Sequence, residues 1–203
     1  MSEAQRRVPP VTDELRAQAA KQRGGWVYAI DPYFDPVDAV PPHGIIGAWE
    51  VQCGQLSKEF RHNHNYRPSP QSLGLPDPSD PVESALQLAA TGYGSETALA
   101  EVLLEATVYL VASDERGATT YTDDDGLFVP VFTDPKHTPT SSARLQRMQL
   151  RALLPLLPSE TTVRLNPRST VSGRVPVADL RAAAGDPHLS ALKKIWVKLQ
   201  RPE

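Results

Sequence analysis

One amphipathic helix followed by three short β-rich runs occupies residues 95–132, and this region constrains the fold more than any other. Ser95 is a residue type that caps helix N-termini, and three strands with turns between them follow the helix. We therefore expect a three-stranded antiparallel meander covered by a helix. Pro130 lacks an amide hydrogen, which predicts that its strand lies near an edge. The apolar stripe of the helix consists of Leu99, Val102, Leu103 and Ala106, and the strands are predicted at 107–111, 119–122 and 127–132.

Before this region, the sequence predicts a short helix, a small antiparallel sheet and a proline-rich segment. Thr12 is a candidate cap for a helix over residues 13–22, and Gly24 and Gly25 end it. Asp80 and Pro81 mark the start of another helix, because proline is tolerated at the first helical position. The strands of the sheet are predicted at 26–30, 45–51 and 55–61, and the proline-rich segment runs from 63 to 81.

After Phe132, the pattern continues with mixed helices and strands. The 20 prolines among 203 residues indicate long ordered connections between these elements. The fold class we predict is α+β, with a small antiparallel N-terminal sheet, a helix-covered antiparallel meander and C-terminal helices. The later elements are predicted as a helix at 144–157 interrupted by Pro155, strands at 161–165 and 171–175, a helix at 176–184 and an amphipathic helix at 189–199.

Composition restricts the class of protein. Cys53 is the sole cysteine, so the chain forms no internal disulfide and no zinc site of several cysteines. Residues 1–23 are polar, and no apolar run is long enough to span a bilayer, so we expect a cytoplasmic protein without an integral membrane segment. The sequence indicates no oligomeric state.

Charge is distributed unevenly along the chain. Residues 24–140 hold 17 acidic and 5 basic residues, whereas residues 141–203 hold 4 acidic and 11 basic ones. Either the two regions offset each other within one fold, or the basic one faces an acidic partner. Three lysines without interleaved aromatic residues on the last predicted helix do not indicate a nucleic-acid-binding surface.

Three groups of polar residues are candidate chemical sites, and each has a simpler explanation. His62 and His64, joined by His43 or Cys53, would make a metal site, but loop histidines are more often solvated. The turn at residues 123–126 lacks the later ligands of a calcium loop, so a hairpin turn explains it. Glu101 and Glu105 lie one helical turn apart, which suits a solvated helix face better than acid–base chemistry. We therefore expect no catalytic residue, cofactor or metal.

The segment NYRPSP at residues 65–70 is the strongest candidate for binding a partner. Long loops without secondary structure often bind something, and Tyr66 and Arg67 are residue types that anchor interfaces. The alternative is a strap between sheets, with Tyr66 packed as a peg. Trp26 and Trp49, on neighbouring predicted strands, join Tyr66 and Arg67 as candidate partner-binding residues.

A series of short motifs resembles a known family. GWVYAIDP (25–32), PPHGIIGAW (41–49), NYRPSP (65–70) and AATGYG (89–94) resemble actinobacterial type VII secretion system-associated proteins. VPVFT (129–133) and LNPRS (165–169) are similar to the N-terminal domain of the SseB-type family. The resemblance implies an α+β fold and a cytoplasmic accessory role near an ESX-type secretion apparatus, with no catalytic residues to transfer.

The resemblance and the motifs together give an expected organisation and function. We expect an N-terminal tail and short helix at 1–24, a small β subdomain with a proline-rich strap at 25–81, and an SseB-like α+β domain at 82–203, unless all three form one continuous unit. The expected function is that of a non-enzymatic adaptor whose protein partner is a secretion component or substrate. The alternative is a small-molecule-binding protein or a hydrolase, with a cleft between the two sheets lined by Trp26, Trp49, Tyr66 and Arg67.

Overall fold

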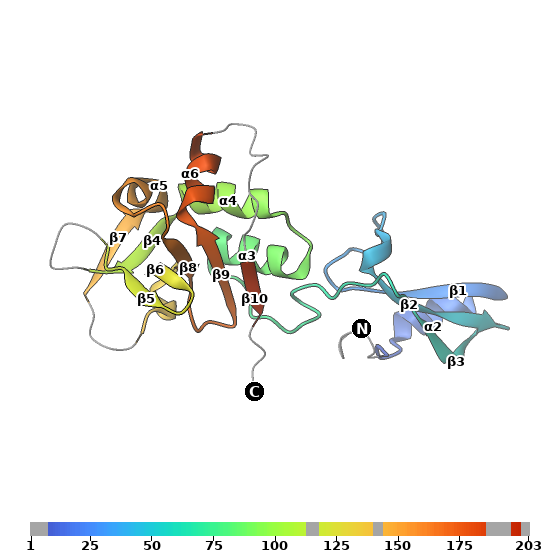
Figure 1. Cartoon of the computed structure of the whole chain (residues 1–203). Helices are drawn as coiled ribbons and strands as arrows, with labels where there is room; N and C mark the ends of the chain where they lie inside the picture. Colours follow the sequence, from blue (N-terminus) through green and yellow to red (C-terminus); the bar gives the residue numbers. More distant parts are fainter. Residues whose placement is uncertain (1–7, 113–117, 140–143, 186–195, 200–203) are drawn as a thin grey trace. The chain divides into compact units, whose positions relative to one another are not determined.

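The structure is a computed structural model, and it describes residues 8–112, 118–139, 144–185 and 196–199 (Figure 1). The chain divides into two compact units, which we call unit 1 (Met1–Pro76) and unit 2 (Asp77–Glu203). Unit 1 contains a small antiparallel sheet, and unit 2 mixes helices with sheets, so the predicted α+β class is confirmed. Over the described ranges, no helix has the length and apolar character needed to cross a membrane.

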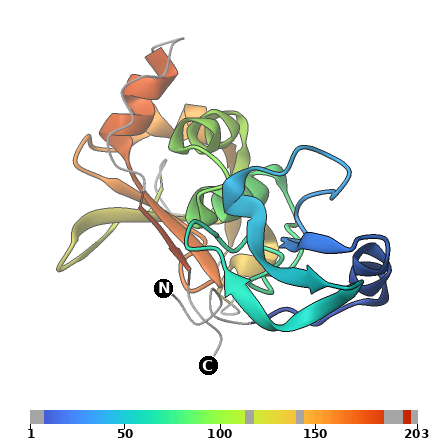
Figure 2. The same ribbon diagram turned by 90° about the vertical axis from the view of Figure 1, so that its right-hand side faces the viewer.

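Unit 1 is a three-stranded antiparallel sheet with one helix on it. The Thr12 hydroxyl caps the helix as predicted, because its Oγ1 accepts a hydrogen bond from the Leu15 amide at 3.4 Å. The strands follow the order β1-β2-β3, so each neighbour in sequence is a neighbour in the sheet, as Figure 2 shows. The elements are α2 (Asp13–Ala20), β1 (Gly24–Ile30), the 3-10 helix η1 (Pro42–Gly44), β2 (Ile45–Gln52) and β3 (Gln55–His62).

One face of this sheet packs on α2 and forms the core of unit 1. Val27 of β1 and Val51 of β2 cluster with Ala19 of α2, and all three are buried. Gly47 of β2 lies under the ring of Phe60, and a Cβ at this position would overlap that ring. The glycine is therefore required for close packing.

Unit 2 contains a five-stranded sheet, a two-stranded sheet and the helices packed on them. The five-stranded sheet has the order β10-β9-β8-β6-β5, in which β6 and β8 are parallel and the other neighbours antiparallel. The helices are α3 (Pro81–Thr91), α4 (Glu96–Glu105), η2 (Pro135–His137), α5 (Leu150–Leu153), η3 (Leu154–Leu156) and α6 (Val177–Gly185). The strands are β4 (Thr107–Val111), β5 (Tyr121–Asp123), β6 (Gly126–Val131), β7 (Leu145–Gln149), β8 (Thr162–Leu165), β9 (Val171–Pro176) and β10 (Trp196–Leu199).

Helix starts in unit 2 follow the predicted capping chemistry. Asp80 Oδ1 accepts hydrogen bonds from the amides of Val82 and Glu83, and Ser95 Oγ accepts one from Ala98. The Glu83 carboxylate reaches back to the Ser79 amide at 2.7 Å rather than to the cap residue itself. The N-terminal end of α3 is thus held by two carboxylates.

The strand pairing in unit 2 departs from the expected meander. Strand β4 pairs with β7 along its length, and Tyr109 of β4 forms an isolated bridge with Phe132, the residue that follows β6. Strands β5 and β6 form the expected hairpin, but β6 then pairs in parallel with β8. The β4 strand therefore leaves the main sheet, because β7 offers it a complete antiparallel partner.

Two predicted helices are wrong in part. The pattern at 144–157 predicted a helix throughout, whereas residues Leu145–Gln149 form β7 and only the following residues are helical. The predicted helix at 189–199 ends in strand β10, which pairs antiparallel with β9, and residues 189–195 lie outside the described residues. In both places an available strand edge overrides a local helical pattern.

The main core of unit 2 lies on one face of the five-stranded sheet. Val129, Val163 and Val175 are adjacent in the sheet register and fully buried or nearly so. Helix α3 packs on this sheet, and a Cβ on Gly173 of β9 would come within 3.0 Å of Leu86 of that helix. The opposite face of the sheet carries Arg164 and Arg174, which are paired in the register of β8 and β9.

Candidate functional site

The face of the unit 1 sheet that α2 leaves uncovered carries aromatic side chains, an arginine and the carboxylate of Glu50, which pairs with Trp26 in the sheet register. Tyr28, Ala48 and Arg61 lie in one row across β1, β2 and β3, because they are paired in the sheet register. Trp26 lies two residues from Tyr28 on the same strand, so it projects from the same face. Tyr28 is 50% exposed, Arg61 is exposed and Trp26 is half-buried. We call Trp26, Tyr28 and Arg61 the aromatic–arginine face.

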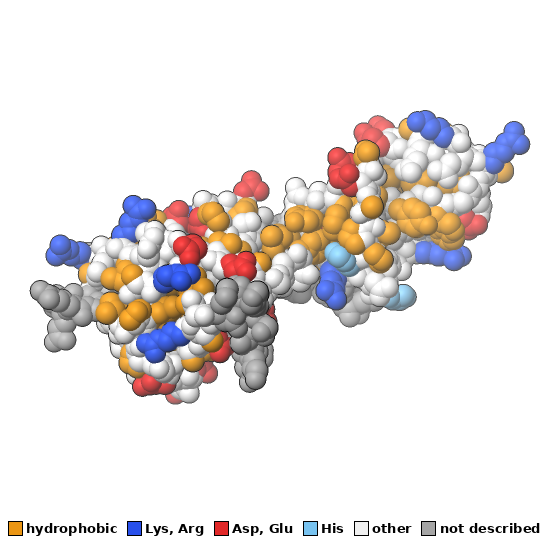
Figure 3. Space-filling model, turned by 90° about the horizontal axis from the view of Figure 1, so that it is seen from above, with side chains coloured by type: hydrophobic (Ala, Val, Ile, Leu, Met, Phe, Trp, Pro, Cys, Tyr) orange, Lys and Arg blue, Asp and Glu red, His pale blue; other side chains and the backbone are white. Residues whose placement is uncertain are grey.

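A cation–π contact organises this face. The guanidinium carbon of Arg61 lies 4.7 Å from the centroid of the Trp26 ring, so a flat charged group covers a flat aromatic one. Hydrophobic side chains are visible over much of the side of unit 1 shown in Figure 3, with basic and histidine side chains among them. Such a surface offers apolar contact area and a fixed positive charge together, the combination common in protein–protein hot spots.

A buried carboxylate anchors the proline-rich segment of unit 1. Asp31 is fully buried, and its Oδ2 accepts hydrogen bonds from the Tyr66 hydroxyl at 2.8 Å, the Ser69 amide at 3.1 Å and the Ser72 hydroxyl at 2.8 Å. Its Oδ1 accepts another from the Tyr33 amide at 3.0 Å. Burial would raise the pKa of the Asp31 carboxyl, but the hydrogen bonds from Ser69, Tyr33 and Ser72 outweigh it and hold that pKa below its usual value.

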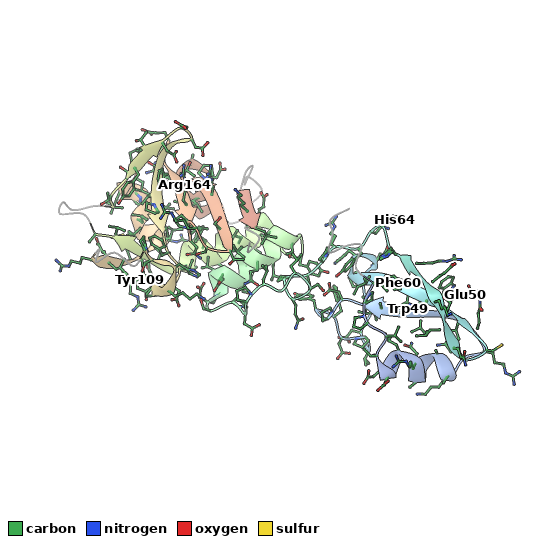
Figure 4. The ribbon with its side chains drawn as sticks, turned by 90° about the horizontal axis from the view of Figure 1, so that it is seen from below. Trp49, Glu50, Phe60, His64, Tyr109 and Arg164 are labelled. Atoms are coloured by element: carbon green, nitrogen blue, oxygen red, sulfur yellow. The ribbon has the colours of Figure 1, made fainter. Side chains whose placement is uncertain are left out.

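The four residues proposed from the sequence for partner binding do not form one surface. Tyr66 is 3% exposed and Trp49 is 2% exposed, so neither is available to a partner or to the lining of a cleft. Trp49 lies beside Phe60, with ring centroids 4.5 Å apart (Figure 4). It pairs with Val27 in the sheet register, so it projects from the α2 side and not from the face of Trp26. Arg67 is exposed on the strap, and Trp26 belongs to the aromatic–arginine face.

Sequence reasoning missed two members of that face and the buried Asp31. Tyr28 was detectable, because two aromatic residues at positions i and i+2 of a strand must share a face. Arg61 was not, because its place beside Trp26 depends on the register of β3. Asp31 gave no signal, since an Asp-Pro pair indicates a loop and not burial.

In unit 2, three segments distant in sequence meet in a polar cluster. The Ser169 hydroxyl lies 2.8 Å from Nδ1 of His137, and Nε2 of that histidine lies 3.7 Å from Oε1 of Glu83. Lys136 Nζ donates to Oε2 of Glu83 at 3.1 Å, and the Ser79 hydroxyl does so at 2.7 Å. The 3.7 Å separation is too long for a hydrogen bond, so histidine and carboxylate interact only electrostatically.

The protonation states in this cluster follow from burial and hydrogen bonding. Burial would raise the pKa of Glu83, but hydrogen bonds from Ser79 and Lys136 lower it below its usual value. Burial lowers the pKa of His137 and outweighs the opposing charge of Glu83, so the imidazole is neutral near pH 7. A neutral imidazole with Nε2–H towards Glu83 has Nδ1 free to accept the proton of Ser169.

Across the open face of the five-stranded sheet, acidic and basic groups neutralise each other. Arg164 binds both carboxylate oxygens of Asp123, at 2.6 and 2.8 Å, and its guanidinium carbon lies 3.7 Å from the centroid of the Phe128 ring. Arg174 binds Asp125 at 2.5 Å. These pairs connect acidic residues of the region 24–140 with basic residues of the region 141–203, as expected if the two regions offset each other within one fold. Figure 4 marks Arg164 in unit 2.

The other candidate groups have structural roles where the chain is described. The acidic turn is a hairpin in which Asp123 pairs with Gly126 between β5 and β6. Glu101 and Glu105 are exposed on α4, and Glu105 pairs with Arg151 at 2.8 Å. Within the described residues, no three of the histidine, cysteine, aspartate and glutamate side chains are arranged to hold a metal ion. His62 instead packs edge-on against Phe60, with ring centroids 4.9 Å apart, and Cys53 is exposed in the turn between β2 and β3.

Part of unit 2 is similar to a known protein family, and this part includes most of α3 and the segments that follow β6 and β8. Residues 82–182 match the model of the SseB protein N-terminal domain. No curated protein matches the chain, and no solved structure does.

The SseB match divides the two candidate sites. Glu83, His137 and Ser169 all lie within the matched residues, as do the ion pairs of Arg164 and Asp123. The aromatic–arginine face lies in unit 1 and outside the match. Glu83, His137 and Ser169 of the polar cluster thus lie in the part of the chain that is similar to the SseB N-terminal domain, whereas the aromatic–arginine face lies in the sequence that precedes it.

Proposed function

We propose that the protein is a non-enzymatic cytoplasmic adaptor associated with type VII (ESX-type) secretion, and that the aromatic–arginine face of unit 1 contacts its protein partner. The proposed partner is a component or a substrate of the secretion system. The link to secretion derives from the resemblance of four motifs, three of them in unit 1, to secretion-associated proteins.

The observation that carries the proposal is the exposure of Tyr28 and Arg61 beside Trp26. Tyrosine, tryptophan and arginine are the side chains most enriched in interface hot spots. Exposed apolar surface is also concentrated in unit 1 within the described part of the chain. Five of the seven exposed large hydrophobic residues there belong to unit 1, namely Val8, Tyr28, Tyr33, Val37 and Leu73.

Charge supports a contact in unit 1 rather than on the sheet of unit 2. The arginines on the open sheet of unit 2 already bind Asp123 and Asp125, so a partner would have to break those ion pairs. Arg61 instead stacks on Trp26 and remains exposed. A partner with an acidic or aromatic anchor gains most by binding over this arginine.

Affinity capture from native cytosol tests the proposal. We expect the tagged wild-type protein to recover an identified secretion component or substrate, and Arg61→Ala to lose it. Arg16→Ala is the matched control, because Arg16 is an exposed arginine on α2, which packs on the opposite face of the same sheet. Arg67→Ala tests the exposed strap position separately. Recovery that is equal for wild type and Arg61→Ala, or absent for wild type, contradicts the proposal.

A second candidate function, that of a hydrolase, is favoured by one observation, the 2.8 Å contact between Ser169 and His137. In this alternative, His137 Nδ1 takes the hydroxyl proton while Ser169 Oγ attacks an ester carbonyl, and the alcohol leaves with that proton. Water then releases the acyl group and regenerates the serine. The Glu83 carboxylate orients the imidazole only weakly at 3.7 Å, so the adaptor remains our first proposal.

Covalent labelling distinguishes this alternative. A fluorophosphonate probe should label the wild-type protein and fail to label Ser169→Ala and His137→Gln if the serine is activated. Wild-type labelling no greater than that of Ser169→Ala would exclude the hydrolase.

A further inference from the structure

Strand β1 is an edge strand without the features that normally prevent edge-to-edge association. It pairs with β2 on one side, and no described strand pairs with its other side. Natural edge strands are commonly protected by charged residues, proline or bulges. From Gly24 to Ile30, β1 contains neither a charged residue nor a proline, and its register shift falls at its last residue.

The other edge of the same sheet is protected. Strand β3 carries Lys58, Glu59 and Arg61, and its pairing with β2 shifts register between Trp49 and Val51. Within one small sheet, therefore, one edge opposes strand addition and the other permits it. The contrast indicates that β1 has a partner in the functional state.

We infer that two copies of the protein associate through antiparallel pairing of β1 with β1, joining two three-stranded sheets into one of six strands. A two-fold axis perpendicular to the sheet keeps each face on one side, so paired residues must share a face. With Val27 on the axis, the seven residues of the strand overlap completely. In this register Trp26 of one copy lies opposite Tyr28 of the other, twice by symmetry.

The second copy suits this edge in side-chain chemistry. Tyr28 is 50% exposed in the single chain, and a tryptophan directly opposite would cover it with an aromatic cross-strand pair. Val27 and Ala29 point to the α2 side and are already buried, so pairing would not change their burial. The aromatic–arginine face would continue from one copy to the next.

Charge complementarity selects a second copy over an unrelated strand. Lys21 and Arg23 precede β1 and are exposed, and the loop after it carries exposed Asp35 and Asp38. Antiparallel self-pairing places the basic end of each strand at the acidic end of the other. Both ends of the interface would therefore attract, and a parallel arrangement would set like charges together.

Sedimentation of the full-length protein tests the association. We expect wild type to approach twice its 22.2 kDa monomer mass as concentration rises. Tyr28→Glu should weaken association about tenfold or more, because both aromatic pairs are lost and two carboxylates enter the interface. Tyr121→Glu is the control, since Tyr121 is 40% exposed but lies in unit 2, and it should associate like wild type. A monomer at every concentration, or a dimer unaffected by Tyr28→Glu, overturns the inference.

Disulfide trapping tests the register. In a Cys53→Ser background, chains carrying Trp26→Cys and chains carrying Tyr28→Cys are oxidised separately and then as a mixture. Opposite residues of an antiparallel pair lie within disulfide range, so the mixture should cross-link whereas each variant alone should not. Absence of mixed cross-links, or cross-linking of either variant alone, overturns the register. These experiments use the purified protein alone and measure only its self-association, so their outcome does not depend on the proposed adaptor function.

Discussion

Replacing Tyr66 with phenylalanine should destabilise unit 1 by about 2 kcal/mol while leaving its packing intact. The ring is retained, so no cavity forms, and only the 2.8 Å hydrogen bond from the hydroxyl to the buried Asp31 carboxylate is lost. Hydrogen bonds to charged groups contribute about 1.5–3 kcal/mol. Three other hydrogen-bond donors to the Asp31 carboxylate remain, so the expected loss of stability lies within this range rather than above it.

Urea unfolding followed by tryptophan fluorescence measures this loss, because two of the three tryptophans, Trp26 and Trp49, lie in unit 1. Tyr28→Phe is the control, since it removes the same hydroxyl from a half-exposed side chain and should stay within about 0.5 kcal/mol of wild type. A Tyr66→Phe protein as stable as the control would refute the assignment of Asp31 as the anchor of the proline-rich segment.

The same measurement has a pH dependence with a defined sign. The pKa of Asp31 is lowered in the folded state, so its carboxylate stabilises the fold above its unfolded-state pKa of about 3.9. That contribution is lost as the pH falls through the folded-state pKa. Because a neutral carboxyl accepts a hydrogen bond worth only about 0.5–1.5 kcal/mol, the cost of Tyr66→Phe should shrink on acidification. An equal cost at acidic and neutral pH would contradict a charged acceptor.

Three further predictions follow from packing and charge. Gly47→Ala should cost about 1–3 kcal/mol in urea unfolding, since its Cβ would overlap both the Arg61 carbonyl oxygen and the Phe60 ring. Gly24→Ala meets only an ordinary 3.8 Å contact and should be far milder. The pKa of Glu83 is lowered in the folded state, so its carboxylate stabilises unit 2 above the unfolded-state pKa of about 4.3, and this contribution is lost as the pH falls through the folded-state pKa. Glu83→Gln should therefore make the stability of unit 2, measured by circular dichroism, less dependent on pH below about 4.3. Arg151→Ala, which removes an exposed partner of Glu105, should change the free energy of unfolding by less than about 1 kcal/mol, and a larger loss would show that this pair is structurally important.

Local chemistry predicted the elements, and long-range pairing decided where the prediction failed. The caps at Thr12, Asp80 and Ser95 were predictable, because each is satisfied by amides two or three residues away. Residues 145–149 have helical spacing of Leu145 and Met148, yet pairing with β4 makes them a strand. No local rule gives that partner, since it lies about forty residues earlier in the chain.

The candidate sites show the same limit. Trp26 was identified from its strand, and its partner Arg61 comes from a strand whose register only the folded sheet defines. Tyr66 was predicted to contact a partner, but its hydroxyl binds a buried carboxylate 35 residues away in the chain, which makes it a buried anchor. The contact of Ser169 with His137 likewise joins segments 32 residues apart.

The most direct test of the adaptor function is a binding titration with the partner recovered by affinity capture. Purified partner is titrated against wild type, Arg61→Ala and Arg16→Ala, with unfolding measured in parallel, since the exposed stack of Arg61 on Trp26 should contribute only about 0.5–1 kcal/mol to stability. We predict that Arg61→Ala raises Kd by roughly tenfold or more, as expected for an interface anchor, and that Arg16→Ala leaves it unchanged. Equal Kd values for all three proteins would contradict a partner bound at the aromatic–arginine face.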